Sequence, residues 1–116
     1  MTHYMRLQPR PFAGIAGGKK TIELRLYDEK RRLLHPGDFI VFTNTDHPHA
    51  QITVQVIKLW PFPDFAALYR VLPLTSCGYS AEELAAASPD DMLPYYSLAQ
   101  QKTYGGVGIE IALLVK

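Results

Sequence analysis

The sequence has 116 residues, of which 47% are hydrophobic and 20% charged, a composition typical of a folded globular protein. A chain of this length forms one domain and can build a core without disulfides or metal, so a two-domain enzyme with an interdomain cleft is not expected. Residues 1–60 hold 9 Lys and Arg against 5 Asp and Glu, a net charge of +4, whereas residues 61–116 hold 3 against 6, a net charge of −3. One basic face could therefore meet an anionic partner, although the chain lacks the overall basicity of a non-specific duplex binder.

The first half of the chain predicts two strands, a short helix and a basic loop. Alternating apolar residues favour a strand over residues 3–8, and two prolines followed by two glycines frame a helix over residues 11–17. The clearest strand is residues 21–27, where Ile22, Leu24 and Leu26 alternate with polar side chains. Residues 28–38 are predicted to form an exposed loop that ends in a Pro-Gly-Asp turn.

The second half predicts three further strands and two helices. Residues 39–42 form an apolar run typical of a strand buried on both faces, and residues 50–60 alternate until the prolines that follow. A helix is expected over residues 65–72, capped by Asp64, and another over residues 80–87, opened by a capping box of Ser80 and Glu83. Ser88 and Pro89 can start one more helical turn.

The chain should close with a glycine-containing strand over residues 104–115, in which the glycines indicate a bulge or a close backbone approach. Five short strands, with helices after the first and the fourth, predict an α+β protein. The expected architecture is a small curled or closed β-barrel of about five strands with short flanking helices, forming a single domain over residues 1–116.

The most informative segment is Gly18-Lys-Lys-Thr-Ile-Glu-Leu-Arg25. Glycine allows a tight turn before the strand, and alternation places Thr21, Glu23 and Arg25 on one face of it. Lys20 enters at the turn, so an ammonium, a carboxylate and a guanidinium converge on one patch. Such a patch can bind phosphate through its cations and read a donor group through Glu23. The spacing is equally compatible with a solvent-exposed ion pair between Glu23 and Arg25 that has no function.

The same residues resemble a known family. The pattern Gly-x-Lys-x-x-Glu-x-Arg at residues 18–25, the segments at residues 26–32 and 36–42, and the closing segments at 104–105 and 109–111 resemble the ASCH domain. This family belongs to the PUA-like superfamily. The resemblance covers most of the chain and implies a small β-barrel flanked by helices, with a cleft lined by the motif. It further implies that the cleft binds RNA or nucleotides.

Some small members of the family are amidohydrolases that remove the acetyl group from N4-acetylcytidine. In them the motif lysine works with a threonine three residues later and with a glutamate from a helical insert. The lysine corresponds to Lys20 here, but the threonine position holds Glu23, and the nearest candidates for the distal glutamate are Glu82 and Glu83. If this chain is a hydrolase, Lys20, Glu23 and the hydroxyl of Thr21 are its candidate catalytic groups.

Other residues could extend a ligand site. Tyr27 continues the polar face of the motif strand, and Arg31 and Arg32, next to Lys30, could follow a nucleic-acid backbone. Tyr95 and Tyr96 could stack on a base. The pair His47 and His49 lacks a third metal ligand nearby, and the single Cys77 cannot form a disulfide framework or a structural zinc site.

We therefore expect a module that binds single-stranded RNA, a nucleotide or a nucleoside, with no metal and no cofactor. Two alternatives remain open: an amidohydrolase acting on N4-acetylcytidine-like nucleosides, and a protein-interaction module in which the cleft is vestigial and the acidic second half binds a partner. No apolar run is long enough to cross a bilayer, and the start of the chain lacks the pattern of a signal peptide. A cytoplasmic location without membrane contact is expected.

Overall fold

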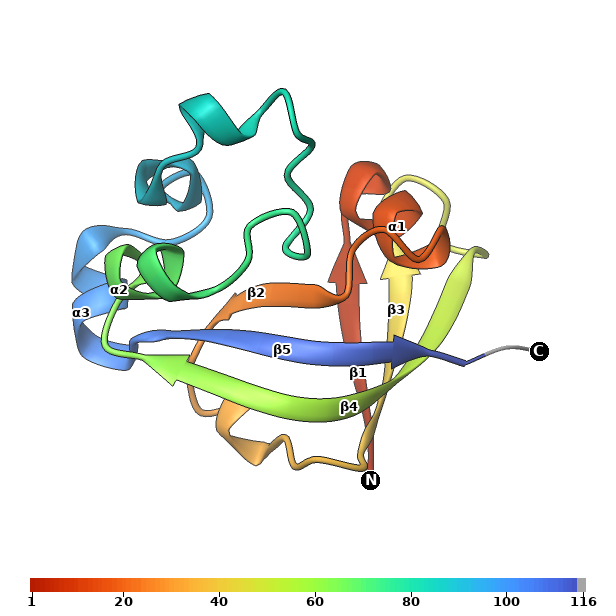
Figure 1. The fold of residues 1–116 in the computed structure, drawn as a ribbon. Coiled ribbons are helices and arrows are strands. Elements are labelled where there is room, and N and C mark those ends of the chain that lie inside the picture. The colour runs from red at the N-terminus through yellow and green to blue at the C-terminus, as the bar shows by residue number, and fades with distance from the viewer. Residues whose placement is uncertain (115–116) are drawn as a thin grey trace.

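The structure, a computed structural model, describes residues 1–114 as a five-stranded sheet curled into a half-barrel with three short helices around it (Figure 1). The strands are β1 (Thr2–Leu7), β2 (Ile22–Leu26), β3 (Phe39–Asn44), β4 (Gln51–Phe62) and β5 (Gly106–Leu113). The helices are α1 (Pro9–Ala16), α2 (Phe65–Val71) and α3 (Leu98–Tyr104). The strand order is β1-β3-β4-β5-β2; β1 and β3 are parallel, and the other pairs are antiparallel. The α+β class and the small five-stranded barrel-like sheet are confirmed.

The two edge strands of the sheet, β1 and β2, are bridged by basic side chains. Arg25 Nη2 in β2 donates to the carbonyl oxygen of Arg6 in β1 at 2.7 Å. Lys30 Nζ, in the loop after β2, donates to the carbonyl oxygen of Tyr4 at 2.9 Å. Carbonyls two residues apart lie on the same edge of a strand, so these cations satisfy acceptors that an edge strand leaves unpaired. The motif strand is thereby held next to β1.

Glycines in β5 allow helix α2 to pack directly on the sheet. A Cβ at Gly106 would lie 3.0 Å from the ring of Phe65, and one at Gly108 would lie 2.5 Å from Leu72 Cδ1. The helix is capped as expected, because Asp64 Oδ1 accepts the N–H of Ala67 at 2.8 Å. At these two glycines side chains approach the strand backbone closely, and the predicted approach of another backbone occurs at Gly105, beside the carbonyl oxygen of Phe62.

Two apolar clusters hold the molecule together. The first fills the inside of the curled sheet under α1, and its largest fully buried side chains include Phe42, Ile40 and Ile15. The second lies between β2 and α2 and also takes in Cys77 and Met92 from the long segment between α2 and α3. This second cluster fixes the segment 73–96 over the motif strand. Cys77 is a free thiol buried in this cluster.

The prediction of a helix over residues 80–87 is wrong. The capping box does form, since Ser80 N–H donates to Glu83 Oε1 and Glu83 N–H donates to Ser80 Oγ. Only a single 3₁₀ turn follows, η2 (Leu84–Ala86), and none of its residues is buried. A short helix in water needs an apolar face to pack, and Pro89 forces the residue before it into an extended conformation. The turn capped by Ser88 forms as η3 (Pro89–Met92).

The end of the chain differs from the prediction in one respect. Helix α3 was not predicted, although Ser97 and Gln100 form a capping box at its start. The closing strand therefore begins at Gly106 rather than at Tyr104, after Gly105 turns the chain with φ of 77°. Val115, the last residue of the expected strand, lies outside the described residues.

Two smaller corrections concern β3 and β4. Strand β4 does not stop before its prolines: Pro61 pairs with Val107, on the opposite strand. In β3 burial alternates, so Ile40 and Phe42 are buried while Phe39 and Val41 are only partly covered. The apolar run is thus covered fully on one face only.

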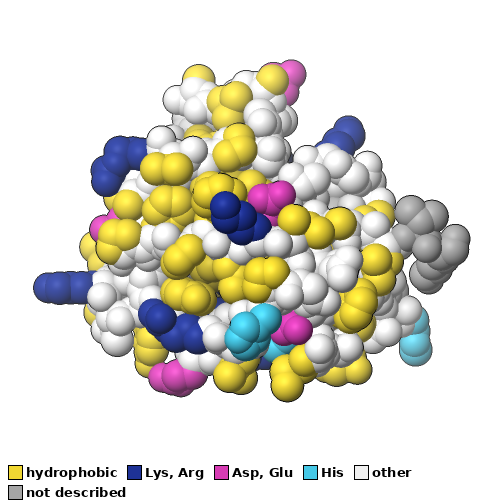
Figure 2. Space-filling view, turned by 60° about the horizontal axis from the view of Figure 1, so that its bottom comes forward, with side chains coloured by type: hydrophobic (Ala, Val, Ile, Leu, Met, Phe, Trp, Pro, Cys, Tyr) yellow, Lys and Arg dark blue, Asp and Glu magenta, His cyan; other side chains and the backbone are white. Residues whose placement is uncertain are grey.

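The side of the molecule that carries the loop between β2 and β3 lies at the bottom of Figure 1 and faces the reader in Figure 2. Hydrophobic side chains gather in the middle of this face, with Lys and Arg side chains around them (Figure 2). Within residues 1–114, none of the helices has the length and hydropathy required to cross a bilayer.

Candidate functional site

The turn between α1 and β2 places Lys20 beneath the segment 73–96. The carbonyl of Gly14 accepts the N–H groups of Lys19 and Lys20, and the carbonyl of Ser76 accepts those of the next two residues. The stem of Lys20 lies between two glycines: a Cβ at Gly14 would be 3.3 Å from Lys20 Cβ, and a Cβ at Gly78 would be 3.3 Å from Lys20 Cδ. Side chains at either glycine would crowd the lysine.

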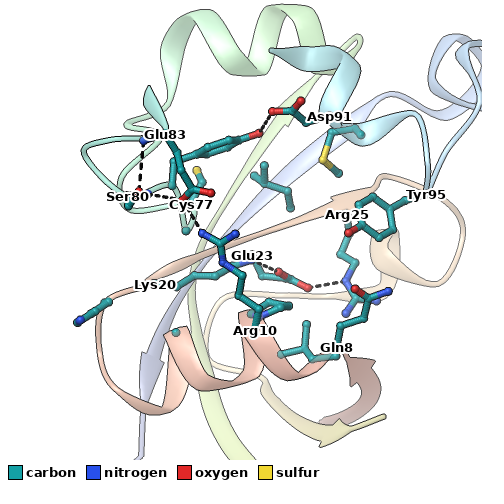
Figure 3. Close-up of a pocket in the computed structure, with 18 of the residues that line it drawn as sticks. Gln8, Arg10, Lys20, Glu23, Arg25, Cys77, Ser80, Glu83, Asp91 and Tyr95 are labelled. Atoms are coloured by element: carbon teal, nitrogen blue, oxygen red, sulfur yellow. Dashed lines mark hydrogen bonds and ion pairs between the residues drawn. The ribbon is translucent and has the colours of Figure 1, made fainter. Parts of the chain in front are cut away.

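Glu23 holds Lys20 and Arg25 together. Its Oε1 lies 2.8 Å from Lys20 Nζ, and its Oε2 lies 2.7 Å from Arg25 Nε. The Glu23 side chain is 5% exposed, and those of Lys20 and Arg25 are 11% and 12% exposed. The expected convergence of the three groups is present, whereas the alternative of an exposed ion pair between Glu23 and Arg25 is wrong. In Figure 3 the three side chains lie in a row across the floor of a pocket.

The charge of Glu23 follows from this arrangement. Burial by itself raises the pKa of the carboxyl, but attraction and hydrogen bonding from Lys20 and Arg25 outweigh it and hold the pKa below its ordinary value of 4.5. Glu23 is therefore ionised at neutral pH. A low pKa and two occupied oxygens make it a poor general base.

The lowered pKa predicts how acid changes stability. Because the folded state holds the Glu23 proton less tightly than the unfolded state does, the stabilisation is complete above pH 4.5 and is lost as the pH falls through the folded pKa. We expect the difference in unfolding free energy between the wild type and Glu23→Gln to shrink as the pH falls below about 4.5, by at most about 1.4 kcal/mol per pH unit. Urea denaturation at a series of pH values measures it. A difference that stays constant with pH would show that folding does not lower the pKa of Glu23.

The pocket above this row has a volume of about 920 Å³, within the range of roughly 300–1,000 Å³ that is typical of small-molecule sites. Five basic and three acidic residues line it, a net charge of +2. The basic residues are Arg6, Arg10, Lys19, Lys20 and Arg25; the acidic ones are Glu23, Glu83 and Asp91. The excess of positive charge favours an anionic ligand.

One side of the pocket mouth is closed by an ion pair. Arg10 Nη2 on α1 donates to Glu83 Oε1, which also accepts the N–H of Ser80 at 2.9 Å (Figure 3). The hydrogen bonds from Arg10 and Ser80 lower the pKa of Glu83 to about 2. Of the two candidates for a distal glutamate, Glu83 lines the pocket and Glu82 does not.

The far wall is fixed by a chain of hydroxyl groups. Tyr79 donates to Asp91 Oδ2 at 2.7 Å, and the hydroxyls of Tyr69 and Tyr79 lie 2.7 Å apart. Asp91 also accepts the N–H of Ser88. These contacts tie α2, the turn after Gly78 and η3 into one wall. Burial and the two hydrogen bonds raise the pKa of Tyr79, so its hydroxyl stays protonated.

The pocket contains some of the expected ligand residues and not others. Tyr95 and Tyr96 both line it, but Tyr96 is stacked on Phe65 with ring centroids 6.0 Å apart. Tyr95 is 57% exposed and leaves a ring face available; Figure 3 shows it beside Arg25. Thr21 is exposed and does not line the pocket.

The basic loop lies elsewhere. Arg31 is engaged by Asp28, with Nη1 2.9 Å from Oδ2. The guanidinium of Arg32 lies 4.2 Å from the centre of the Tyr27 ring, and its Nη2 donates to the carbonyl of Tyr104. Tyr27 and Arg32 line a separate, shallower hollow of about 400 Å³ that has no lining residue in common with the main pocket.

Sequence reasoning missed the rim of the pocket. Arg10 stands between two prolines at the start of a helix, a position that carries no ligand signal. The sequence indicates Glu83 as a capping residue and as one of two candidates for a distal glutamate, but it does not indicate a partner in Arg10. Tyr69 and Tyr79 come from segments whose contact depends on the tertiary fold.

Comparison with known proteins places this geometry in a family. The family model of the ASCH domain matches residues 5–113. The crystal structure of hypothetical protein PH0355 aligns with a TM-score of 0.81 at 31% identity, covering 98% of this chain and 100% of that one. The solution structure of protein PF0455 from Pyrococcus furiosus aligns with a TM-score of 0.72, also at 31% identity, and covers both chains completely.

A more distant likeness concerns the fold alone. A crystal structure of a point mutant of the ZmASCH protein from Zymomonas mobilis aligns with a TM-score of 0.66 at 15% identity, covering 95% of this chain and 68% of that one. No functionally curated protein matches the sequence. The match over residues 5–113, together with the two full-length structural relatives, shows that the chain belongs to the ASCH domain family, whose fold is PUA-like.

Proposed function

We propose that this ASCH domain binds a nucleotide, either free or as a unit of single-stranded RNA, in the pocket above Glu23. The observation that carries the proposal is the row of Lys20, Glu23 and Arg25, in which one buried carboxylate holds two cations on the floor of a pocket of net charge +2.

The row is suited to an oxyanion because its cations are fixed before the ligand arrives. Lys20 donates one of its three N–H groups to Glu23, and Arg25 uses its Nε toward Glu23 and its Nη2 toward Arg6. The remaining N–H groups can bind phosphate or carbonyl oxygens without further loss of side-chain freedom. Glu23 acts in this proposal as the group that orients both cations.

An aromatic surface for the base is available at the same end of the pocket. Tyr95 lines the pocket beside Arg25 and is more than half exposed, so a base can stack on its ring (Figure 3). Tyr96 supports this ring, at a centroid distance of 6.5 Å, and is itself stacked on Phe65. We therefore assign the stacking contact to Tyr95.

The hydrolase alternative is supported by one observation, the presence of Lys20 and Glu83 in the same pocket. Hydrolysis of an amide also needs a nucleophile and a base. Thr21 lies outside the pocket lining, and burial raises the pKa of Cys77 to about 11, which leaves its thiol protonated. A binding function therefore fits better. Release of cytidine from N4-acetylcytidine by the purified protein would overturn this preference.

The interaction-module alternative requires the pocket to have no ligand. Burying a carboxylate with two cations costs desolvation free energy. A pocket that binds no ligand would not need such an arrangement. The apolar face of Figure 2 could contact a protein, but no feature of that face indicates which one.

Fluorescence anisotropy with a labelled single-stranded RNA tests the proposal. We expect the dissociation constant to rise with salt concentration and to rise at least about ten-fold in Lys20→Met, which keeps the apolar stem between the two glycines but removes the charge. Arg70→Ala, an exposed arginine outside the pocket, removes the same charge and should change binding little. Circular dichroism at the assay temperature confirms that each variant is folded. Equal binding by Lys20→Met and Arg70→Ala would refute the assignment of the site.

A further inference from the structure

We infer that Arg10 is the contact by which the pocket selects phosphorylated nucleotides over nucleosides, and that Glu83 competes with the ligand phosphate for it. The inference rests on the proposed function and adds to it the chemical class of the ligand.

The floor cations are buried and held by Glu23, whereas Arg10 is exposed and held by a single partner. Lys20 and Arg25 are nearly buried and are held by Glu23. The side chain of Arg10 is 73% exposed, and within residues 1–114 its guanidinium is hydrogen-bonded only to Glu83. An exposed pair of this kind is weak in water, so a stronger anion can displace the carboxylate.

The backbone around Arg10 does not offer an alternative anion site. Helix α1 begins with Pro9 and Pro11, which have no N–H group, and the N–H of Phe12 is already bonded to the carbonyl of Gln8. The first turn therefore lacks the row of free donors that usually binds phosphate at a helix N-terminus. Charge recognition at this side of the pocket depends on the guanidinium of Arg10.

Glu83 is held where it can compete. The capping box fixes its Oε1 by the N–H of Ser80, so the carboxylate stays at the mouth of the pocket even when Arg10 turns away. A phosphate that enters the pocket can take the place of Glu83 as the partner of Arg10, because it carries more negative charge and more acceptor oxygens than a carboxylate.

Isothermal titration with the four nucleoside 5′-monophosphates and the four nucleosides tests the inference. The readout is the selectivity, which is the dissociation constant of a nucleoside divided by that of its monophosphate. We expect Arg10→Ala to lower the selectivity about ten-fold while nucleoside affinity changes less than two-fold. We expect Glu83→Gln to raise it about two- to five-fold, because the amide oxygen still accepts from Ser80 but the competing charge is gone.

Two matched controls are available in the chain. Glu82→Gln removes the neighbouring carboxylate, and Arg70→Ala removes an exposed arginine; neither residue lines the pocket. Both should leave the selectivity unchanged. A distorted pocket would bind nucleosides and nucleotides more weakly alike. The nucleoside affinity therefore reports structural damage, whereas the selectivity reports the loss of the phosphate contact.

The outcomes separate the inference from the proposed function. Binding of monophosphates with the same selectivity in the wild type, Arg10→Ala and Glu83→Gln overturns the role of Arg10 and leaves the nucleotide pocket intact. Absence of binding by any of the eight ligands and by single-stranded RNA overturns the proposed function itself. A decrease of selectivity in Glu83→Gln would show that Glu83 assists Arg10 rather than competing with the ligand, which also overturns the inference.

Discussion

We expect Glu23→Gln to lower the free energy of unfolding by about 3–5 kcal/mol, the usual effect of removing one partner from a buried ion pair. The glutamine amide has one acceptor oxygen, whereas Glu23 now accepts from Lys20 Nζ and Arg25 Nε through two oxygens at 2.8 and 2.7 Å. One cation would face the amide N–H₂ group, and both would lose their compensating charge. For a domain of this size the melting temperature should fall by roughly 10–20 °C.

Glu82→Gln is the matched control for this experiment. Glu82 is exposed, and the same substitution there should change stability by less than about 0.5 kcal/mol. Urea denaturation of both variants at pH 7 gives the comparison. If Glu23→Gln were as stable as Glu82→Gln, the carboxylate would not be the centre of the network, and the description of the site would be wrong.

Gly105→Ala should destabilise the fold by about 3 kcal/mol or more. Gly105 joins α3 to β5 with φ of 77° and ψ of −179°, a backbone conformation that essentially only glycine adopts. A Cβ at this position would lie 2.4 Å from the carbonyl oxygen of Phe62, a backbone atom of the adjacent strand β4. The alanine therefore adds a clash with backbone to the cost of about 1–3 kcal/mol for a backbone conformation that alanine rarely adopts.

The substitution Gly18→Ala separates the conformational cost from the steric clash. Gly18 has nearly the same φ, 78°, but a Cβ there would meet no heavy atom within 4 Å. Gly18→Ala should cost only the conformational part, about 1–2 kcal/mol. Guanidinium denaturation of the two variants measures the difference. Equal losses would show that β4 and β5 can separate at this point without cost, contrary to the close approach described above.

The sequence predicts the strands well because alternation and turn residues are local signals. Residues 21–27 alternate cleanly, and the structure forms β2 there. The capping of α2 by Asp64 was also predictable, because the cap acts within four residues. The same kind of local signal failed at Ser80 and Glu83, where the capping hydrogen bonds form but no apolar face stabilises a helix.

The site was predictable only in part for a related reason. The spacing of Lys20, Glu23 and Arg25 brings these groups together on a turn and a strand, so local geometry is sufficient. Their burial is not a local property: it depends on the cover that segment 73–96 provides and on the bridge from Arg25 to β1. The pairing of Arg10 with Glu83 joins residues 73 positions apart, which periodicity cannot reveal.

The same limit applies to the basic loop. Arg31 and Arg32 follow the motif directly in sequence, but the chain turns after β2 and carries them to another surface. Their proximity in sequence to the motif therefore gave no information about proximity to the pocket.

The most direct test of the account is a two-dimensional ¹⁵N–¹H spectrum of the labelled protein during titration with a nucleoside 5′-monophosphate. Binding in the pocket above Glu23 should cause concentration-dependent shifts of the backbone amides that surround it, at Lys20, Arg25, Gly78 and Tyr95, together with Arg10 on the rim. Amides of the second hollow, at Tyr27, Arg32 and Lys102, should remain unshifted. Shifts confined to the second hollow, or no shifts at millimolar nucleotide and with single-stranded RNA, would contradict the claim that the pocket above Glu23 is the ligand site.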